Sequence, residues 1–303
     1  MADLLQILKG TSGTVTETFE IDGAPINVDA GLPTLAISRP DATAYTPLPT
    51  VLDTWAGPPA RTTGQYRCVL PRQLECTWLD YELTGTIGGQ PQTLGGRVEW
   101  LGATLFNISA MRALKVAGSK PFESTTTWPD AKLHEARAAT LDEFTQILAF
   151  SPVPRFARET VDGDGLWSVV LPHLKCHDLL SVTVNGVAQS VGSYTLRRSG
   201  ILEATSGYVA SGTFTAGRQN VVVEYVHGEP RVMGNGGHMA MMFAAADLDP
   251  SGFSNGATVT TPDGVSYTYE PSETGRGGVE RPTGIRIVDR WLRRWGQAAG
   301  WAA

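Results

Sequence analysis

The chain contains 303 residues, of which 42% are hydrophobic and 18% are charged, and its formal net charge is −6. This composition excludes a protein that is disordered throughout, and at roughly 100 to 200 residues per domain the length predicts two domains. The net negative charge also argues against a broad surface for binding polyanions such as duplex DNA.

The 34 glycines and 19 prolines favour a strand-rich protein with many turns. Its three cysteines, Cys68, Cys76 and Cys176, show no CxxC spacing. We interpret them as reduced and partly buried, which favours the cytoplasm as the compartment. The N-terminal residues lack the basic segment of a signal peptide, and no apolar run reaches roughly 18 residues. We therefore expect neither export by an N-terminal signal nor a membrane span.

The first predicted domain covers residues 1–118. Short runs of alternating polar and apolar residues, separated by Gly and Pro turn signals, recur between Thr14 and Met111. This spacing predicts an antiparallel β-sandwich, immunoglobulin-like or related. The segment 75–83 alternates most clearly, as expected of a strand with one face exposed to solvent. One side carries Cys76, Trp78, Asp80 and Glu82, and the other carries Thr77, Leu79, Tyr81 and Leu83.

The second predicted domain covers residues 119–303 and opens with a helix over 128–150. Thr127 is placed to cap its N-terminus, Pro129 suits the first turn, and the prolines that follow residue 150 prevent its continuation. A β insertion is predicted over 155–228, with a hairpin turn at Asn185 and Gly186.

After the insertion, a second helix is predicted over 232–248. Its glycines, Gly234, Gly236 and Gly237, each cost about 1 kcal/mol relative to Ala, so its start is poorly defined. We interpret this glycine-rich segment as a hinge and not as a phosphate-binding loop, because no Gly-Lys-Ser/Thr follows it. The fold class is thus α+β.

Residues 250–284 are rich in glycine and predict an extended arm, and residues 285–295 predict a short C-terminal helix. Apolar and basic side chains occupy different faces of this helix. The apolar stripe is Ile285, Val288, Leu292 and Trp295, and the arginines are Arg286, Arg290, Arg293 and Arg294. The helix either packs on its own domain or binds a partner, since Trp and Arg are enriched at binding hot spots.

The motifs that would indicate metal binding or catalysis are incomplete. His173, Cys176 and His177 lack the further ligand pair of an ordinary zinc site. The segment 162–165 reads Asp-Gly-Asp-Gly, but Leu166 and His173 stand where a calcium loop needs ligands. The chain also has no G-x-S-x-G or H-E-x-x-H motif. We therefore predict no enzyme, no catalytic residues, no metal and no cofactor.

Four segments carry a resemblance to a known family: WPDAKLHEARAATLDEFTQILAFSPVPRFARE, LLSVTVNGVAQSVGSYTLRRSGILEA, QNVVVEYVHGEP and PTGIRIVDRWLRRW. In this order they resemble head-to-tail adaptor proteins of long-tailed bacteriophages, also called head completion or connector proteins, over about residues 120–300. The N-terminal sandwich departs from the simplest adaptors, and it resembles immunoglobulin-like extensions of other virion proteins.

The resemblance implies a virion protein, made in the host cytoplasm, that forms a dodecameric ring with copies of itself. Its other partners would be the portal protein and a stopper or other tail-side connector protein, and DNA would pass through the channel without sequence-specific binding. The implied portal interface is Ile285, Arg286, Val288, Arg290, Trp291, Leu292, Arg293, Arg294 and Trp295. Tyr267 and Tyr269 would lie on an arm that reaches a neighbouring subunit.

A second interpretation is a β-rich phage tail or receptor-binding protein with an immunoglobulin-like carbohydrate-binding module. Such a protein would expose a concave aromatic site and would not need two helices that flank a β insertion. A small hydrolase would require a pocket with convergent acids or histidines.

Overall fold

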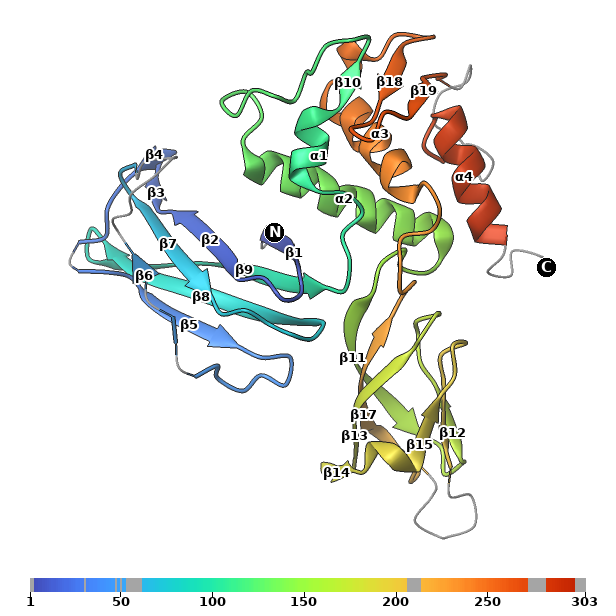
Figure 1. Ribbon diagram of the computed structural model, residues 1–303. Coiled ribbons are helices and arrows are strands. Elements are labelled where there is room, and N and C mark those ends of the chain that lie inside the picture. Colours follow the sequence, from blue (N-terminus) through green and yellow to red (C-terminus); the bar gives the residue numbers. More distant parts are fainter. Residues whose placement is uncertain are drawn as a thin grey trace. The chain divides into compact units, whose positions relative to one another are not determined.

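The computed structural model describes residues 3–29, 31–46, 48–49, 51–52, 62–205, 214–271 and 282–297. The fold is α+β, as predicted, and strands outnumber helices among these residues (Figure 1). The chain divides into two compact units, Met1–Gly102 and Ala103–Ala303.

The first unit is built from strands. They are β1 (Asp3–Leu8), β2 (Gly13–Thr18), β3 (Glu20–Ile21), β4 (Ala24–Pro25), β5 (Thr34–Ser38), β6 (Val51–Leu52), β7 (Gln65–Leu70), β8 (Thr77–Ile87) and β9 (Gln90–Leu101). A four-stranded sheet has the order β1-β9-β8-β5, and a three-stranded sheet has the order β2-β7-β6.

One hydrophobic core joins these two sheets, which makes the unit a β-sandwich. In β8, Leu79, Tyr81 and Leu83 are buried in this core, as their predicted alternation requires. The sheet that contains β8 is mixed and not purely antiparallel, because β1 pairs with β9 in parallel. The prediction of a purely antiparallel sandwich was therefore wrong in this respect.

The division between the units falls earlier than the predicted boundary at residue 118. Helix α1 (Ile108–Ala113) and strand β10 (Lys115–Val116) belong to the second unit. The reason is long-range pairing: β10 is antiparallel to β18 (Thr258–Thr260), far along the chain. Sequence spacing alone could not reveal that pairing.

Three further helices form the centre of the second unit: α2 (Asp130–Leu148), α3 (Gly236–Leu248) and α4 (Arg286–Gln297). They lie near the predicted ranges, although α3 begins later than residue 232. Thr127 does not cap α2, because Pro129 occupies the N-cap position and provides no side-chain bond. Thr127 instead accepts a hydrogen bond from the Ser124 hydroxyl at 3.1 Å.

Aromatic side chains join the three helices. The ring of Phe144 on α2 lies 5.6 Å from that of Phe243 on α3 and 5.6 Å from that of Trp291 on α4, measured between centroids. All three residues are buried. Because buried aromatic rings contribute a large apolar area, this contact holds α4 against α2 and α3.

The β insertion lies between α2 and α3 in the chain and forms a separate lobe of the second unit in Figure 1. Its strands are β11 (Arg155–Gly163), β12 (Ser168–Val170), β13 (Asp178–Val184), β14 (Val187–Gln189), β15 (Tyr194–Leu196), β16 (Ile201–Ala204) and β17 (Gly217–His227), with a short 3-10 turn, η1 (Val191–Ser193). The sheets β11-β17-β13-β14 and β12-β16-β15 enclose a hydrophobic core of their own.

The predicted hairpin in the insertion is present. Asn185 and Gly186 connect β13 to β14 with positive φ angles of 52° and 76°. This is the backbone that an Asn-Gly turn favours, since Gly and Asn accept left-handed conformations at low cost.

Residues 250–271 are not an extended arm in the structure. They contain a 3-10 turn, η2 (Pro250–Gly252), and the hairpin of β18 and β19 (Ser266–Thr268). Together with β10 this hairpin forms a three-stranded sheet in the order β10-β18-β19. The remainder of the predicted arm, residues 272–281, lies outside the described residues.

Among the described residues, no helix combines the length and the apolar character needed to cross a membrane.

We predict that Gly236→Ala destabilises the second unit. A Cβ at Gly236 would lie 2.6 Å from Cζ2 of Trp291 and 3.0 Å from Cγ1 of Val232, and the Trp291 ring is buried. Overpacking of this kind costs about 1–3 kcal/mol, measurable as a lower free energy of unfolding in urea. The control is Gly192→Ala, because the nearest atom to its new Cβ is 3.9 Å away. Equal stability of the two variants would contradict the prediction.

Candidate interaction site at the C-terminal helix

A buried hydrogen-bond network fixes the start of α4. Oδ1 of Asp289 accepts hydrogen bonds from the backbone N–H of Thr283 at 2.9 Å and from its hydroxyl at 2.6 Å. The N–H of Ile285 in turn donates to the Thr283 hydroxyl at 3.2 Å. Thr283 and Asp289 are both buried. Because these bonds satisfy donors at the helix N-terminus, they fix the point at which the chain enters α4.

The apolar face of α4 is packed on its own unit. Ile285, Val288, Trp291 and Leu292 are buried, and Trp291 contacts Phe144. The sequence-based hypothesis placed these four side chains in the portal interface. In the structure they pack against α2 and α3, which removes their apolar surface from water. Trp295 is half-buried.

The outward face of α4 is cationic. Arg286, Arg290, Arg293 and Arg294 are exposed. Arg286 forms a loose ion pair with Glu270, with Nη1 and Oε2 separated by 3.4 Å. Within the described part of the chain, the other three form no ion pair, and the Arg294 guanidinium lies 5.8 Å from the Trp295 ring. A row of unneutralised guanidinium groups favours a partner that carries carboxylates or phosphates.

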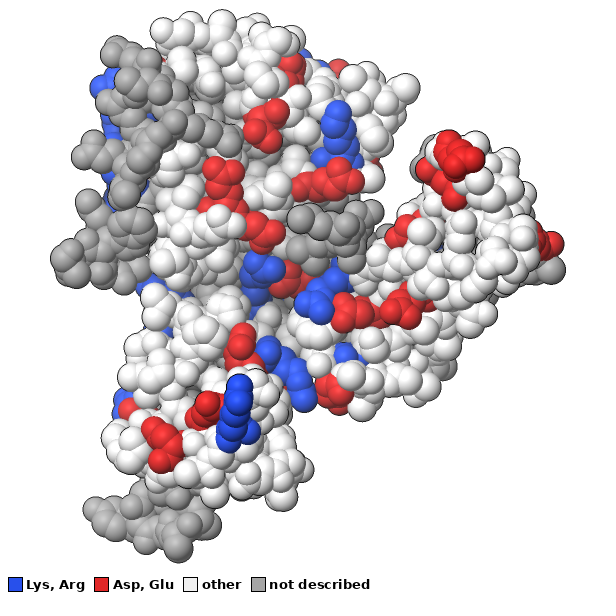
Figure 2. All heavy atoms as spheres, turned by 180° about the vertical axis from the view of Figure 1, so that it is seen from behind, with Lys and Arg blue, Asp and Glu red and all other residues white. Residues whose placement is uncertain are grey.

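Charge is mixed on one face of the molecule. On the face shown in Figure 2, acidic and basic side chains of the described residues are interspersed among uncharged ones. The local concentration of arginines on α4 therefore differs from this face, where neither sign dominates.

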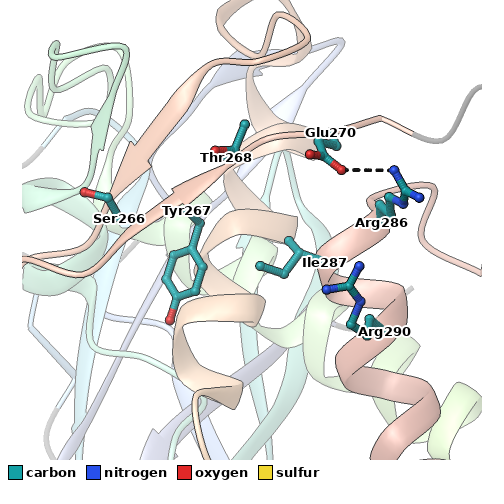
Figure 3. Close-up of a pocket in the computed structure, with 7 residues that line it drawn as sticks. All are labelled: Ser266, Tyr267, Thr268, Glu270, Arg286, Ile287 and Arg290. Atoms are coloured by element: carbon teal, nitrogen blue, oxygen red, sulfur yellow. Dashed lines mark hydrogen bonds and ion pairs between the residues drawn. The ribbon is translucent and has the colours of Figure 1, made fainter.

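A small cleft of about 260 Å³ lies between β19 and α4. It is lined by Ser266, Tyr267, Thr268, Glu270, Arg286, Ile287 and Arg290 (Figure 3). Figure 3 shows the side chains of Ile287 and Arg290 on the α4 side and Ser266 and Thr268 on the strand. The cleft combines an edge strand, one aliphatic side chain and guanidinium groups.

Tyr267 and Tyr269, predicted to reach a neighbouring subunit, contact their own unit. The Tyr267 hydroxyl lies 2.9 Å from Nδ1 of His238 on α3. The ring of Tyr269 packs edge-on against Phe253 at a centroid distance of 5.1 Å. Both side chains are half-buried and make these contacts within their own unit.

The histidines of the insertion are closer together than their spacing suggests. The rings of His173 and His227 stack with centroids 3.9 Å apart, and Nδ1 of His173 lies 2.7 Å from the Tyr225 hydroxyl. Burial, followed by the charges of His173, Arg155 and His177, lowers the pKa of His227 to about 3. Burial and Arg155 also lower the pKa of His173. The stacked pair is therefore uncharged at neutral pH.

Within the described residues, no group of three or more His, Cys, Asp or Glu side chains is placed to hold a metal ion. Cys176 is buried, and burial raises the pKa of its thiol to about 11, so it is neither a ready ligand nor a nucleophile at neutral pH.

The Asp-Gly-Asp-Gly segment 162–165 and the glycines at the start of α3 have local structural roles. Oδ1 of Asp162 accepts the N–H of Gln219 at 2.6 Å, and Oδ1 of Asp164 accepts the N–H of Leu166 at 2.8 Å. Both carboxylates thus bond to the backbone of their own lobe. Gly236 and Gly237 allow close packing, because a Cβ at Gly237 would lie 2.7 Å from the carbonyl oxygen of Leu105.

Sequence reasoning missed two features of this unit. The stacking of His173 and His227 depends on β17 returning to the base of the insertion, and the cleft depends on β19 lying beside α4. The one sequence feature that indicated the cleft was the basic character of the last helix, which forms one of its walls.

Comparison with known proteins adds little. The sequence matches no protein-family model. It also matches no curated protein. Among solved structures, the chain is similar to the crystal structure of a DUF4785 family protein from Legionella pneumophila, with 9% identity and a TM-score of 0.22. The similarity covers 88% of this chain and 54% of that one, so this chain spans about half of its length. Similarity at this level supports no conclusion about function.

We predict that Trp291→Ala is much more destabilising than Trp295→Ala. Trp291 is buried against Phe144, whereas Trp295 is half-buried at the end of α4. Loss of a buried Trp side chain costs about 3–5 kcal/mol. Urea denaturation of the two variants measures the difference. If Trp295→Ala were the more damaging substitution, the packing described for α4 would be incorrect.

We also predict that His227 contributes to loss of stability in acid. Its folded-state pKa of about 3 is below the value of about 6.5 expected in the unfolded chain, so the unfolded state binds the proton first. Stability should therefore fall as the pH drops from about 6.5 towards 3. The contribution between pH 7 and pH 5 should be about 1–2 kcal/mol, and His227→Gln should remove it. Urea denaturation at the two pH values measures this; an unchanged pH dependence in the variant would contradict it.

Proposed function

We propose that this chain is the head-to-tail adaptor of a long-tailed bacteriophage. It would form a ring of identical subunits between the portal and a stopper or other tail-side connector protein. The observation that carries the proposal is the arrangement of the second unit. A β lobe with its own core is inserted between α2 and α3, and a terminal helix with a cationic outer face follows.

The β insertion supports lateral contact between subunits. Several large apolar side chains of the lobe are exposed: Leu166, Trp167, Val170 and Val187. Leu166, Trp167 and Val170 are close in sequence at β12, and exposed apolar groups that lie together are typical of interaction surfaces. A closed ring needs a heterologous interface, in which one surface of each subunit meets a different surface of the next.

The terminal helix supports docking on the portal, through the cationic part of the interface that the sequence suggested. With the apolar face of α4 packed on α2 and α3, the available groups are the four arginines and the half-buried Trp295. Guanidinium groups bind carboxylates with defined geometry. The portal surface that receives α4 should accordingly be acidic.

The charge balance is compatible with DNA as cargo. The chain carries a net charge of −6, and charges are mixed on the face in Figure 2. A strongly basic channel would displace counterions from DNA and retain it. A channel without that excess lets DNA pass.

Within the described part of the first unit, one aromatic ring that the carbohydrate-binding alternative could use is covered. The side chain of Trp78 in the first unit lies under the guanidinium of Arg97, at 3.7 Å from the ring centroid. That ring face is therefore unavailable to stack on a sugar.

We predict that the double variant Arg293→Glu/Arg294→Glu loses binding to the portal protein of the same virus without loss of stability. The matched control is Arg218→Glu, which reverses an exposed charge on the β insertion. Electron microscopy should show rings, or a stoichiometric portal complex, for the unmodified chain and the control. A complex that forms equally well with the double variant would overturn α4 docking. Monomers that never bind a portal would overturn the adaptor function itself.

A further inference from the structure

Among the described strands, β19 lies at the edge of its sheet, and no strand lies beside its outward backbone groups. In the β18–β19 hairpin, the N–H of Thr261 donates to the carbonyl of Val265 at 2.9 Å, and the N–H of Tyr269 donates to Ala257 at 2.8 Å. Because antiparallel residues alternate between bonded and non-bonded pairs, the N–H and C=O groups of Ser266 and Thr268 point away from β18.

The next outward backbone group on the same edge, the carbonyl of Glu270, already accepts a hydrogen bond. The carbonyl of Glu270 accepts the N–H of Arg286 at 3.0 Å, and Pro271 forms a bridge with Ile285. The start of α4 thus covers this end of the edge. Within the described parts of the chain, nothing pairs with the outward groups of Ser266 and Thr268. Unpaired edges of this kind are templates for an added strand.

The cleft of about 260 Å³ lies along this open edge. Its far wall is α4, which contributes the half-buried Ile287 and the exposed Arg290 (Figure 3). In a strand added beside β19, alternate side chains would point towards α4. One such position would meet the aliphatic Ile287 and another would meet the guanidinium of Arg290.

The positive charge of Arg286 and Arg290 at the cleft favours a ligand that carries carboxylates. Arg290 forms no ion pair with any residue that the structure describes. Arg286 is held only by the 3.4 Å pair with Glu270, in which both side chains are largely exposed, at 68% and 49%. Exposed pairs of this kind contribute little energy, so Arg286 can change partner.

We propose that the β19 edge and its cleft bind an extended, carboxylate-bearing peptide segment of another protein. The segment adds a fourth strand to the sheet β10-β18-β19 and pairs with Ser266 and Thr268. An aliphatic side chain of the segment packs on Ile287, and a carboxylate from another side chain of the segment binds Arg290. A phosphate ligand fits less well, because the edge offers carbonyl groups as well as N–H groups and Glu270 borders the cleft.

This surface goes beyond the adaptor proposal, whose test changes only Arg293 and Arg294. Neither of those residues lines the cleft. The two proposals can therefore fail separately, since portal docking and peptide binding are changed by different substitutions.

The test is an NMR titration of the full-length, isotope-labelled chain with two synthetic peptides. The first is acetyl-Val-Thr-Glu-Thr-Val-amide, whose Val and Glu side chains share one face of a strand. In the second, Lys replaces Glu. We expect saturable shifts of the Ser266 and Thr268 amides with the Glu peptide, and affinity at least about tenfold lower for the Lys peptide, which corresponds to 1.4 kcal/mol.

Two pairs of variants locate the binding. Arg290→Glu should reverse the preference between the peptides, whereas Arg294→Glu, on the same helix but outside the cleft, should leave it unchanged. Thr268→Pro should abolish binding, because it removes an outward N–H that β18 does not use. Thr268→Val keeps that N–H and should bind normally. If Thr268→Pro fails to fold, the Arg290→Glu result decides.

Three outcomes would overturn the proposal. The first is equal binding of the two peptides, or no shift of Ser266 and Thr268 at millimolar concentration. The second is the same shifts produced by inorganic phosphate, which would make the site an anion site. The third is shifts that depend on the concentration of the protein alone and vanish in Arg290→Glu, which would assign the edge to a second copy of this chain.

Discussion

Trp291 packs on Phe144 of α2 and lies so close to the start of α3 that a Cβ at position 236 would overlap its ring. The position of α4 depends on this contact, together with the Thr283–Asp289 bonds at the helix N-terminus. With the apolar face of α4 turned inward, its arginines face solvent and Arg290 borders the β19 edge. One buried aromatic contact thus determines which chemistry the end of the chain presents to partners.

The β insertion obeys a second constraint at its base. β11 and β17 connect the lobe to α2 and α3, and the stacked rings of His173 and His227 lie where these strands begin and end. Burial keeps His227 neutral, which links the stability of this junction to pH. The core of the lobe is independent of the helices. A lobe with its own core can present a surface to a neighbouring chain without disturbing the helices that hold α4.

Local patterns predicted the elements well where the cause was local. The alternation of residues 75–83 identified β8 and its buried face, and the Asn185-Gly186 pair identified a hairpin. One local prediction was wrong by two residues: Thr127 suited a helix cap, but Pro129 occupies that position. Local patterns also failed where distant residues decided the outcome. The glycine-rich residues 250–271 read as an arm, yet their hairpin is completed into a sheet by β10, which the predicted boundary placed in the other domain.

The sequence by itself determined the α+β class, the order of helix, insertion and helix, and the separation of apolar from basic residues on the last helix. These properties follow from turn chemistry and periodicity, which act over a few residues. Only the tertiary structure decided which face of that helix is free. An amphipathic stripe is equally suited to its own core and to a partner, and the choice depends on whether a complementary buried surface lies within reach. In this chain Phe144 and Phe243 provide that surface, so Trp291 stabilises the fold and the arginines remain available for recognition.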